Sequence, residues 1–230
     1  MSDPSPQPGI LAAPPALGRS LTFRIEPESD ARAALLALRD GFAPDWGVAA
    51  LGEPAVRAEG LDVPGLRVFP ALAGAGISIP STQQALWILL RGEDRGALFD
   101  VTEKVRSLVA PAFALDDAMD MFLYAGGRDL TGFEDGTENP AGDAAVDAAI
   151  VAGGAFAGSS FVAVQRWVHD LERFRAFPRE KRDHTIGREL ESNDEIEDAP
   201  PSAHVKRTAQ ESFDPPAFMV RRSMPWATAD

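Results

Sequence analysis

The sequence predicts an α+β fold of two related units, each an antiparallel sheet with helices on one face. Residues 19–127 alternate short apolar stretches with two helical patterns, in the order strand, helix, strand, strand, helix, strand. Residues 128–230 repeat the opening of that order without its closing helix and final strand. We therefore expect two domains with these boundaries, preceded by an extended, proline-rich arm over residues 1–18.

The first unit opens with clear strand and helix signals. Leu21, Phe23 and Ile25 alternate with polar residues, which is typical of a half-buried strand. Asp30 precedes Ala31–Arg39, a stretch with apolar residues on one helical face, and its carboxylate can cap that helix. The other expected elements of this unit are strands at Trp46–Leu51, Ala85–Leu90 and Ala112–Tyr124, a helix from Asp94 to about Val109, and a mostly irregular stretch over residues 52–82.

This order of elements is the ferredoxin-like arrangement, in which both helices cover one face of the sheet. Ala85–Leu90 is an unbroken apolar run, so we expect a strand buried on both faces. The elements expected in the second unit are a weak helix at Ala141–Ala155, a strand at Ser160–Val168, a helix at Leu171–Phe177 capped by Asp170, a basic stretch to Ile186, an acidic solvated loop at Glu189–Asp198 and a strand at Pro216–Arg222. Such an incomplete unit leaves a strand edge unpaired.

Composition narrows the class of function. The net charge of −13 argues against binding to nucleic acid or to an anionic membrane surface, because the long-range field repels both. No cysteine is present, which excludes disulfides, thiolate metal sites and cysteine nucleophiles. The N-terminus has no basic region followed by an apolar core, and no apolar run reaches membrane-spanning length. We expect a cytoplasmic protein.

The stretch Asp129–Pro140, DLTGFEDGTENP, is the strongest candidate for a functional loop. Glycines on either side of Asp135 allow a tight backbone that brings this carboxylate close to a ligand, and the final proline prevents a helix. An ordinary turn is the alternative, because turns favour the same residue types. A haloacid dehalogenase phosphatase would need an aspartate at the position of Phe133, and the alternating oxygen ligands of a calcium-binding EF-hand are also missing.

Few histidines are available for chemistry. His169 lies at the junction of a strand and a helix, and His184 lies in a basic stretch, so we interpret both as surface or cap residues. His204 stands close to Arg207 after the acidic loop, and either a ligand role or a surface role fits its position.

Arg221 and Arg222 close an apolar strand pattern. Side chains alternate along a strand, so only one of these arginines can face a pocket. A pair of surface arginines that offsets the acidic composition is the alternative.

Five separated motifs, in this order, resemble the dye-decolorizing peroxidases, and most resemble the bacterial branch that includes YfeX-like proteins. The motifs are GFEDGTENP at 132–140, VQRWVHDL at 164–171, IGR at 186–188, PSAHVKR at 201–207 and RRSMPW at 221–226. The resemblance implies two ferredoxin-like domains that form a dimeric α+β barrel. It also implies a second domain that is incomplete at its C-terminus here, since family members continue beyond this point.

The resemblance also implies one haem b per chain, bound in the second domain, and a set of site residues. His204 would be the axial ligand of the haem iron, and Arg207 would lie near a haem propionate. On the opposite face of the haem, Asp135 would be the family's distal aspartate, Arg221 its distal arginine, and Ser223 a neighbouring distal residue. An imidazole ligand leaves the opposite side of the iron open to hydrogen peroxide. A carboxylate can move the proton of peroxide, and a fixed positive charge can stabilise the departing oxygen.

The implied function is that of a haem-dependent peroxidase, which reduces hydrogen peroxide and oxidises dyes or phenolic compounds as small organic reductants. A homo-oligomer is expected, with no nucleic-acid or membrane partner. The alternative is a haem carrier or storage protein with incidental peroxidase activity. Aromatic side chains that could relay electrons from large reductants, or else simply pack in the core, are Trp46, Trp87, Trp167, Trp226 and Tyr124.

Overall fold

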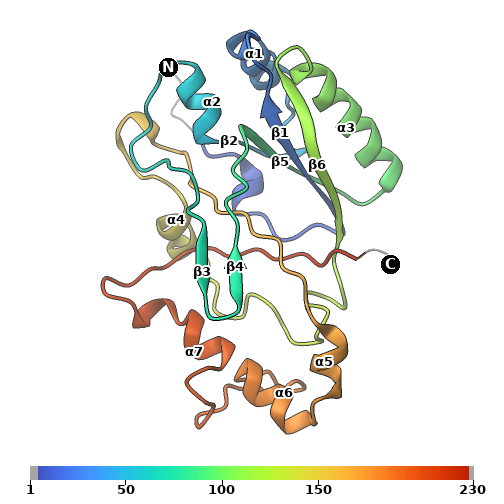
Figure 1. Cartoon of the computed structure of the whole chain (residues 1–230), viewed down its shortest axis with the longest axis vertical. Helices are drawn as coiled ribbons and strands as arrows, with labels where there is room; N and C mark the ends of the chain where they lie inside the picture. The colour runs from blue at the N-terminus through green and yellow to red at the C-terminus, as the bar shows by residue number, and fades with distance from the viewer. Residues whose placement is uncertain (1–4, 228–230) are drawn as a thin grey trace.

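The computed structural model describes residues 5–227, and its one large sheet is built from the first half of the chain. The four strands of this antiparallel sheet are β1 (Leu17–Ile25), β2 (Gly47–Leu51), β5 (Leu86–Gly92) and β6 (Phe113–Phe122). They lie in the order β2-β5-β1-β6 (Figure 1). β1 is central, between β5 and β6, and β2 lies at the far edge beside β5. This is the strand order of a ferredoxin-like sheet, so the prediction for this half is confirmed.

Two helices cover one face of this sheet. They are α1 (Ala31–Gly41) and α3 (Arg95–Val109), and Figure 1 shows both on the same side. The predicted caps are confirmed, because the carboxylates of Asp30 and Asp94 each accept a hydrogen bond of 2.9 Å from a backbone amide in the first turn. Within residues 5–227, no helix is long and apolar enough to cross a bilayer.

The core lies between the sheet and these helices. Leu21, Leu86, Ile88 and Leu90 are fully buried there, and burying each side chain stabilises the fold by about 1.5–3 kcal/mol. The opposite face of β5 is only half-buried. The prediction that this strand is buried on both faces is therefore wrong, because helices cover only one side of the sheet.

The remaining elements of the first half are η1 (Pro8–Ile10), α2 (Glu53–Ala58) and a hairpin of β3 (Leu72–Gly74) and β4 (Ile77–Ile79). The hairpin reaches away from the large sheet and is mostly exposed (Figure 1). The N-terminal arm is attached to the edge of the sheet by Gln7. Its carboxamide both donates to the Ala49 carbonyl and accepts from the Ala49 amide, each at 2.9 Å.

The second half consists of short helices joined by long loops. The helices are α4 (Asp143–Ala149), η2 (Gly154–Phe156), α5 (Leu171–Ala176), α6 (Arg179–Ile186), α7 (His204–Thr208) and η3 (Gln210–Ser212). Figure 1 shows α5, α6 and α7 at the end of the molecule away from the large sheet, with the C-terminal segment crossing between them and that sheet. The cap at Asp170 is confirmed, since its carboxylate accepts from Arg173 N at 3.0 Å.

Two predicted strands of the second half are wrong. Residues 160–168 and 216–222 are extended, but neither segment belongs to a strand of the described chain. Residues 161–169 make no backbone–backbone hydrogen bond within residues 5–227, and all of them are exposed. The apolar pattern was sufficient for an extended backbone, but a strand also needs a neighbour for its N–H and C=O groups. A sheet in the second half of the chain and a dimeric barrel stay predictions.

Candidate functional site

Asp129–Pro140, called the Asp135 loop below, has the tight backbone that its glycines predict. Gly132 and Gly136 have φ angles of 93° and 75°, which are strained for residues with a side chain. Arg128 and Glu134 form an isolated antiparallel bridge, which closes the loop on itself. The Asp135 amide donates to the Gly127 carbonyl at 3.1 Å, while its carboxylate is exposed and makes no hydrogen bond within residues 5–227.

A small apolar contact and an arginine anchor this loop. Phe133 is 4% exposed and meets the ring of Phe174 of α5 edge-on, at 6.2 Å between ring centroids. The guanidinium of Arg128 donates to the carbonyls of Gly132 at 2.8 Å and Leu190 at 3.1 Å. Phe133, the residue that argues against a haloacid dehalogenase phosphatase, thus packs the loop against α5.

The acidic segment after α6 also contacts the Asp135 loop. The carboxamide of Asn193 donates to Glu134 at 3.0 Å and to Thr137 at 2.9 Å. Arg188 pairs with Glu138 and donates to the Asn193 carbonyl at 2.9 Å. The prediction of an acidic, solvated loop at Glu189–Asp198 is confirmed, since the segment is irregular and mostly exposed. Its charged and amide groups also connect it to the Asp135 loop, which the sequence did not predict.

His204 is the first residue of α7, and its side chain is available for a ligand. The residue is exposed, and its ring makes no hydrogen bond among the residues that the structure describes. Arg207 follows three positions later, about one helical turn along, and is likewise exposed without an ion-pair partner in that part of the chain. The two residues therefore offer an imidazole and a positive charge from neighbouring positions of one helix.

Gly187 explains the IGR motif structurally. It ends α6 in the left-handed conformation, with φ 92° and ψ 15°. A Cβ at this position would lie 2.2 Å from the Val205 side chain and 3.2 Å from Ala203. The missing side chain thus lets the end of α6 pack directly against the residues on both sides of His204.

Arg221 and Arg222 have different surroundings. The Arg222 guanidinium donates to the carbonyls of Leu11 and Ala12 in the N-terminal arm, at 3.2 and 3.1 Å. Burial lowers the pKa of Arg222 below its ordinary value. The Arg221 guanidinium makes no hydrogen bond or ion pair in residues 5–227, so Arg221 is the arginine available to the candidate site. Ser223 is exposed.

The structure joins the Asp135 loop to Arg221 through Asn139. The Asn139 carboxamide accepts from Arg221 N and donates to Arg221 O, each at 2.7 Å. No ion pair forms between Asp135 and Arg221 in the described chain. Asn139 and Gln210, which also contacts this segment, were missed as functional candidates, because turn-forming and polar residue types carry no signal of a distant backbone partner.

The other histidines and aromatic residues differ in exposure. His184 Nδ1 lies 2.8 Å from the Glu180 carbonyl in the same helix, and His169 Nε2 lies 3.8 Å from Oδ2 of the half-buried Asp129. Trp167 is 61% exposed, whereas the Trp87 indole is half-buried and donates to Ser20 at 2.8 Å. Among the possible relays, Trp167 is thus the side chain most open to a large reductant.

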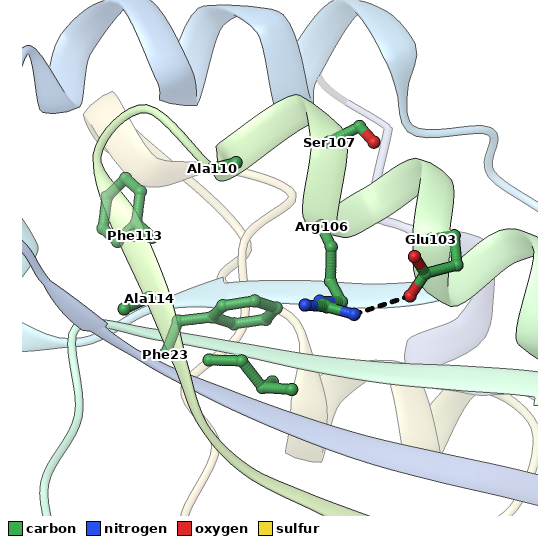
Figure 2. Close-up of a pocket in the computed structure, with 8 residues that line it drawn as sticks. Phe23, Glu103, Arg106, Ser107, Ala110, Phe113 and Ala114 are labelled. Carbon is green, nitrogen blue, oxygen red and sulfur yellow. Dashed lines mark hydrogen bonds and ion pairs between the residues drawn. The ribbon is translucent and has the colours of Figure 1, made fainter.

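A surface hollow of about 420 Å³ lies away from these residues, between α3 and the start of β6. Figure 2 shows Phe23 and Phe113 at this hollow, together with Arg106, which pairs with Glu103 at 2.7 Å. None of the predicted site residues lines it, and its charged pair is already satisfied. The candidate site is therefore the surface formed by the Asp135 loop, α7 and the C-terminal segment.

Known proteins resemble this chain in sequence and in fold. A family model described as Dyp-type peroxidase, C-terminal, matches residues 126–230. A dye-decolorizing peroxidase from Rhodococcus erythropolis is 35% identical over 152 residues, which are 64% of this chain and 44% of the relative. A second one, from Mycolicibacterium paratuberculosis, is 31% identical over 168 residues, or 70% of this chain and 47% of the relative. The chain thus spans less than half the length of these relatives.

Solved structures agree with the sequence relatives. A dyp-type peroxidase protein from Shewanella oneidensis superposes with a TM-score of 0.89 at 25% identity, over 99% of this chain and 80% of that one. A DypB variant from Rhodococcus jostii, solved in complex with haem, gives a TM-score of 0.77 at 28% identity, over 88% of this chain and 71% of that one. Sequence motifs, family model and fold lead to the same conclusion: residues 126–230 match the C-terminal family model of the Dyp-type peroxidases, and the chain has the fold of their solved structures.

Proposed function

We propose that this chain binds haem b and acts as a peroxidase, reducing hydrogen peroxide at the expense of dyes or phenolic compounds. The observation that carries the proposal is that the side chains of His204, Arg207 and Arg221 have no polar partner within residues 5–227. Asn139 joins Arg221 to the Asp135 loop. Lys206 of α7 pairs with Glu195, in the segment that Asn193 joins to the same loop. A relative solved in complex with haem supports the same cofactor. Membership of the YfeX-like branch, the domain boundaries, a homo-oligomer and a cytoplasmic location stay predictions.

The residues present fit a haem. An imidazole whose ring nitrogens have no other partner is a suitable ligand for haem iron, and His204, at the start of α7, is such a residue within residues 5–227; it would hold the iron. Arg207 supplies a cation that suits a propionate carboxylate. When bound, the haem would supply the iron that takes up peroxide and the electrons that reduce it.

Asp135 is proposed to move the proton of peroxide. Its carboxylate accepts the proton from the oxygen that stays and returns it to the oxygen that leaves, so that the leaving oxygen departs as water. Arg221 holds a positive charge close to where negative charge develops on the departing oxygen, which lowers the barrier by about 3 kcal/mol. Ser223, two residues beyond Arg221, is proposed to orient peroxide through its hydroxyl.

A haem carrier or storage protein is the second candidate function. The observation that favours it is the absence of any Asp135–Arg221 ion pair in the described chain, together with the exposure of Asp135. Without a contact between them, Asp135 and Arg221 have no fixed relative position. Their proposed catalytic roles need such a fixed geometry, whereas haem storage does not.

Turnover measurements test the proposal directly. After reconstitution with haem, peroxide-dependent oxidation of an anthraquinone dye should fall by about 10²–10⁴-fold in Asp135→Asn and by about 10²–10³-fold in Arg221→Leu. Asp147→Asn on α4 is the matched control, because Asp147 is also exposed and lies outside the candidate site. Normal haem binding with unchanged turnover in both site variants would reject the peroxidase role and favour the carrier.

A further inference from the structure

Residues 217–221 of the C-terminal segment are held along one edge by one backbone carbonyl and two carboxamide side chains, where a neighbouring strand would normally lie. The amide of Ala217 donates to the Gln210 carbonyl at 2.9 Å, and the amide of Met219 donates to Gln210 Oε1. The amide of Arg221 donates to Asn139 Oδ1 at 2.7 Å. In an extended chain, N–H groups two residues apart point to the same edge, so these bonds form one continuous row.

Asn139 pairs with Arg221 as a neighbouring strand would. Its carboxamide accepts from Arg221 N and donates to Arg221 O, which reproduces both bonds of a hydrogen-bonded residue pair in a sheet. Gln7 makes the same two-way contact with Ala49 of the edge strand β2, so a second contact of this type occurs within residues 5–227.

Gln210 connects the segment to the helix that carries His204. It follows α7 at the start of η3 and is only 5% exposed. Its Nε2 also lies 3.5 Å from the Glu138 carbonyl, a long contact that brings it beside Asn139. One buried carboxamide thus touches both the C-terminal segment and the Asp135 loop.

Gly136 leaves the space that Asn139 occupies. A Cβ on Gly136 would lie 2.7 Å from Asn139 Nδ2, which is closer than a side chain tolerates. The absence of a side chain at Gly136 therefore leaves the Asn139 carboxamide free to take the position in which it contacts Arg221.

We propose that Asn139 and Gln210 form a carboxamide clamp that fixes the backbone of residues 217–221 and so positions Arg221 beside the Asp135 loop. Neither residue touches the reacting atoms, so both are positioning residues. The effect on catalysis rests on the proposed peroxidase function, whereas the effect on the backbone does not.

Hydrogen exchange of single amides tests the clamp in the haem-free chain. In Asn139→Ala the Arg221 amide should exchange about five- to tenfold faster than in the wild type, because it loses its acceptor. Asn139→Asp keeps an acceptor but cannot donate to the Arg221 carbonyl, so its exchange rate should lie between the other two. Gln210→Leu should accelerate exchange of the Met219 amide by a similar factor.

Asn193→Gly is the matched control for this experiment. It removes a carboxamide that contacts the same loop but not residues 217–221, and glycine tolerates the φ of 62° at that position. Unchanged exchange of the β5 amides shows that each variant is folded. The clamp is rejected if Arg221 exchanges equally fast in the wild type and Asn139→Ala, or if Asn193→Gly accelerates it as much.

The haem-loaded protein separates this inference from the proposed function. Asn139→Ala should slow the reaction with peroxide at least about tenfold, with haem affinity within about threefold of the wild type. Asn139→Asp should recover part of the rate, which a general loss of folding would not allow. If the wild type binds haem but does not react with peroxide, the proposed function fails, while the exchange rates still decide the clamp.

Discussion

At the scale of single residues, the candidate site depends on a few positions with strict local requirements. Gly187 must be small and left-handed so that α6 can pack against α7, and Gly136 must leave room for Asn139. Asn139 and Gln210 then replace the strand that residues 217–221 lack. These requirements are steric and directional, so conservative substitutions at these positions should have large effects.

Gly187→Ala should destabilise the fold more than a glycine replacement in open space. The new methyl group adds a clash with Val205 to the cost of a left-handed alanine, for a loss of about 2–4 kcal/mol in the free energy of unfolding. Gly60→Ala is the matched control, because Gly60 has a φ of 66° and nothing within 4 Å of its Cβ position. That variant should lose only about 1 kcal/mol. Equal losses in urea unfolding would contradict the packing argument.

The ion pair between Arg19 and Asp120 should make stability depend on pH in the acid range. The hydrogen bonds of Arg19 to both Asp120 oxygens, at 2.5 and 3.0 Å, lower the pKa of Asp120. A lowered pKa contributes stability above the unfolded value of about 4 and loses it as the pH falls through the folded value. Wild type should therefore unfold at higher urea concentration than Asp120→Asn near pH 7, with a gap that closes below about pH 4.

Asp45→Asn is the control for this pH dependence, since Asp45 is exposed and has no ion-pair partner within residues 5–227. It should track the wild type at every pH. A gap between wild type and Asp120→Asn that stays constant down to the most acidic pH would show that the Arg19 contact does not set the pKa of Asp120.

At the scale of elements, the sequence predicted best what local chemistry determines. Asp30, Asp94 and Asp170 marked three helix starts correctly, because a cap is formed by residues three positions apart. Helix α6 was missed because it is polar all round, although Pro178 before it and Gly187 after it are typical helix boundaries. The strands at 160–168 and 216–222 were wrong because strand pairing depends on distant neighbours.

The same reasoning limits prediction of the site. Asp135, His204 and Arg221 were identified by motif, and the tight glycine loop by residue type. The contact between Asn139 and Arg221, which joins the Asp135 loop to the C-terminal segment, spans 82 residues of sequence, and no local pattern indicates such a contact.

Residues 161–169 provide a prediction at this scale. They are exposed and make no backbone–backbone hydrogen bond in the described chain, so their amides should exchange with solvent close to the rate of an unfolded peptide. The amides of β5, which is paired on both edges, should be protected to the level of global unfolding. Mass spectrometry of hydrogen exchange on the haem-free chain makes the comparison, and similar protection of the two peptides would contradict the extended, unpaired description.

At the scale of the whole molecule, the two halves are stabilised differently. The first half has an apolar core between one sheet and two helices, whereas Phe133, Ala199 and Ala203 are the buried apolar side chains found in the described part of the second half. Polar contacts hold the second half together, including those of Arg128, Arg188 and the carboxamide clamp. Haem binding at His204 would add a large apolar contact to this half and raise its stability by linkage.

The most direct test of the central claim is the absorption spectrum of the chain titrated with haem. Wild type should develop a Soret band typical of histidine-ligated haem, His204→Ala should lose it, and His184→Ala should retain it as the matched histidine control, because His184 bonds within its own helix. A Soret band that is unchanged in His204→Ala, or that is absent from the wild type, would contradict the assignment of His204 as the iron ligand.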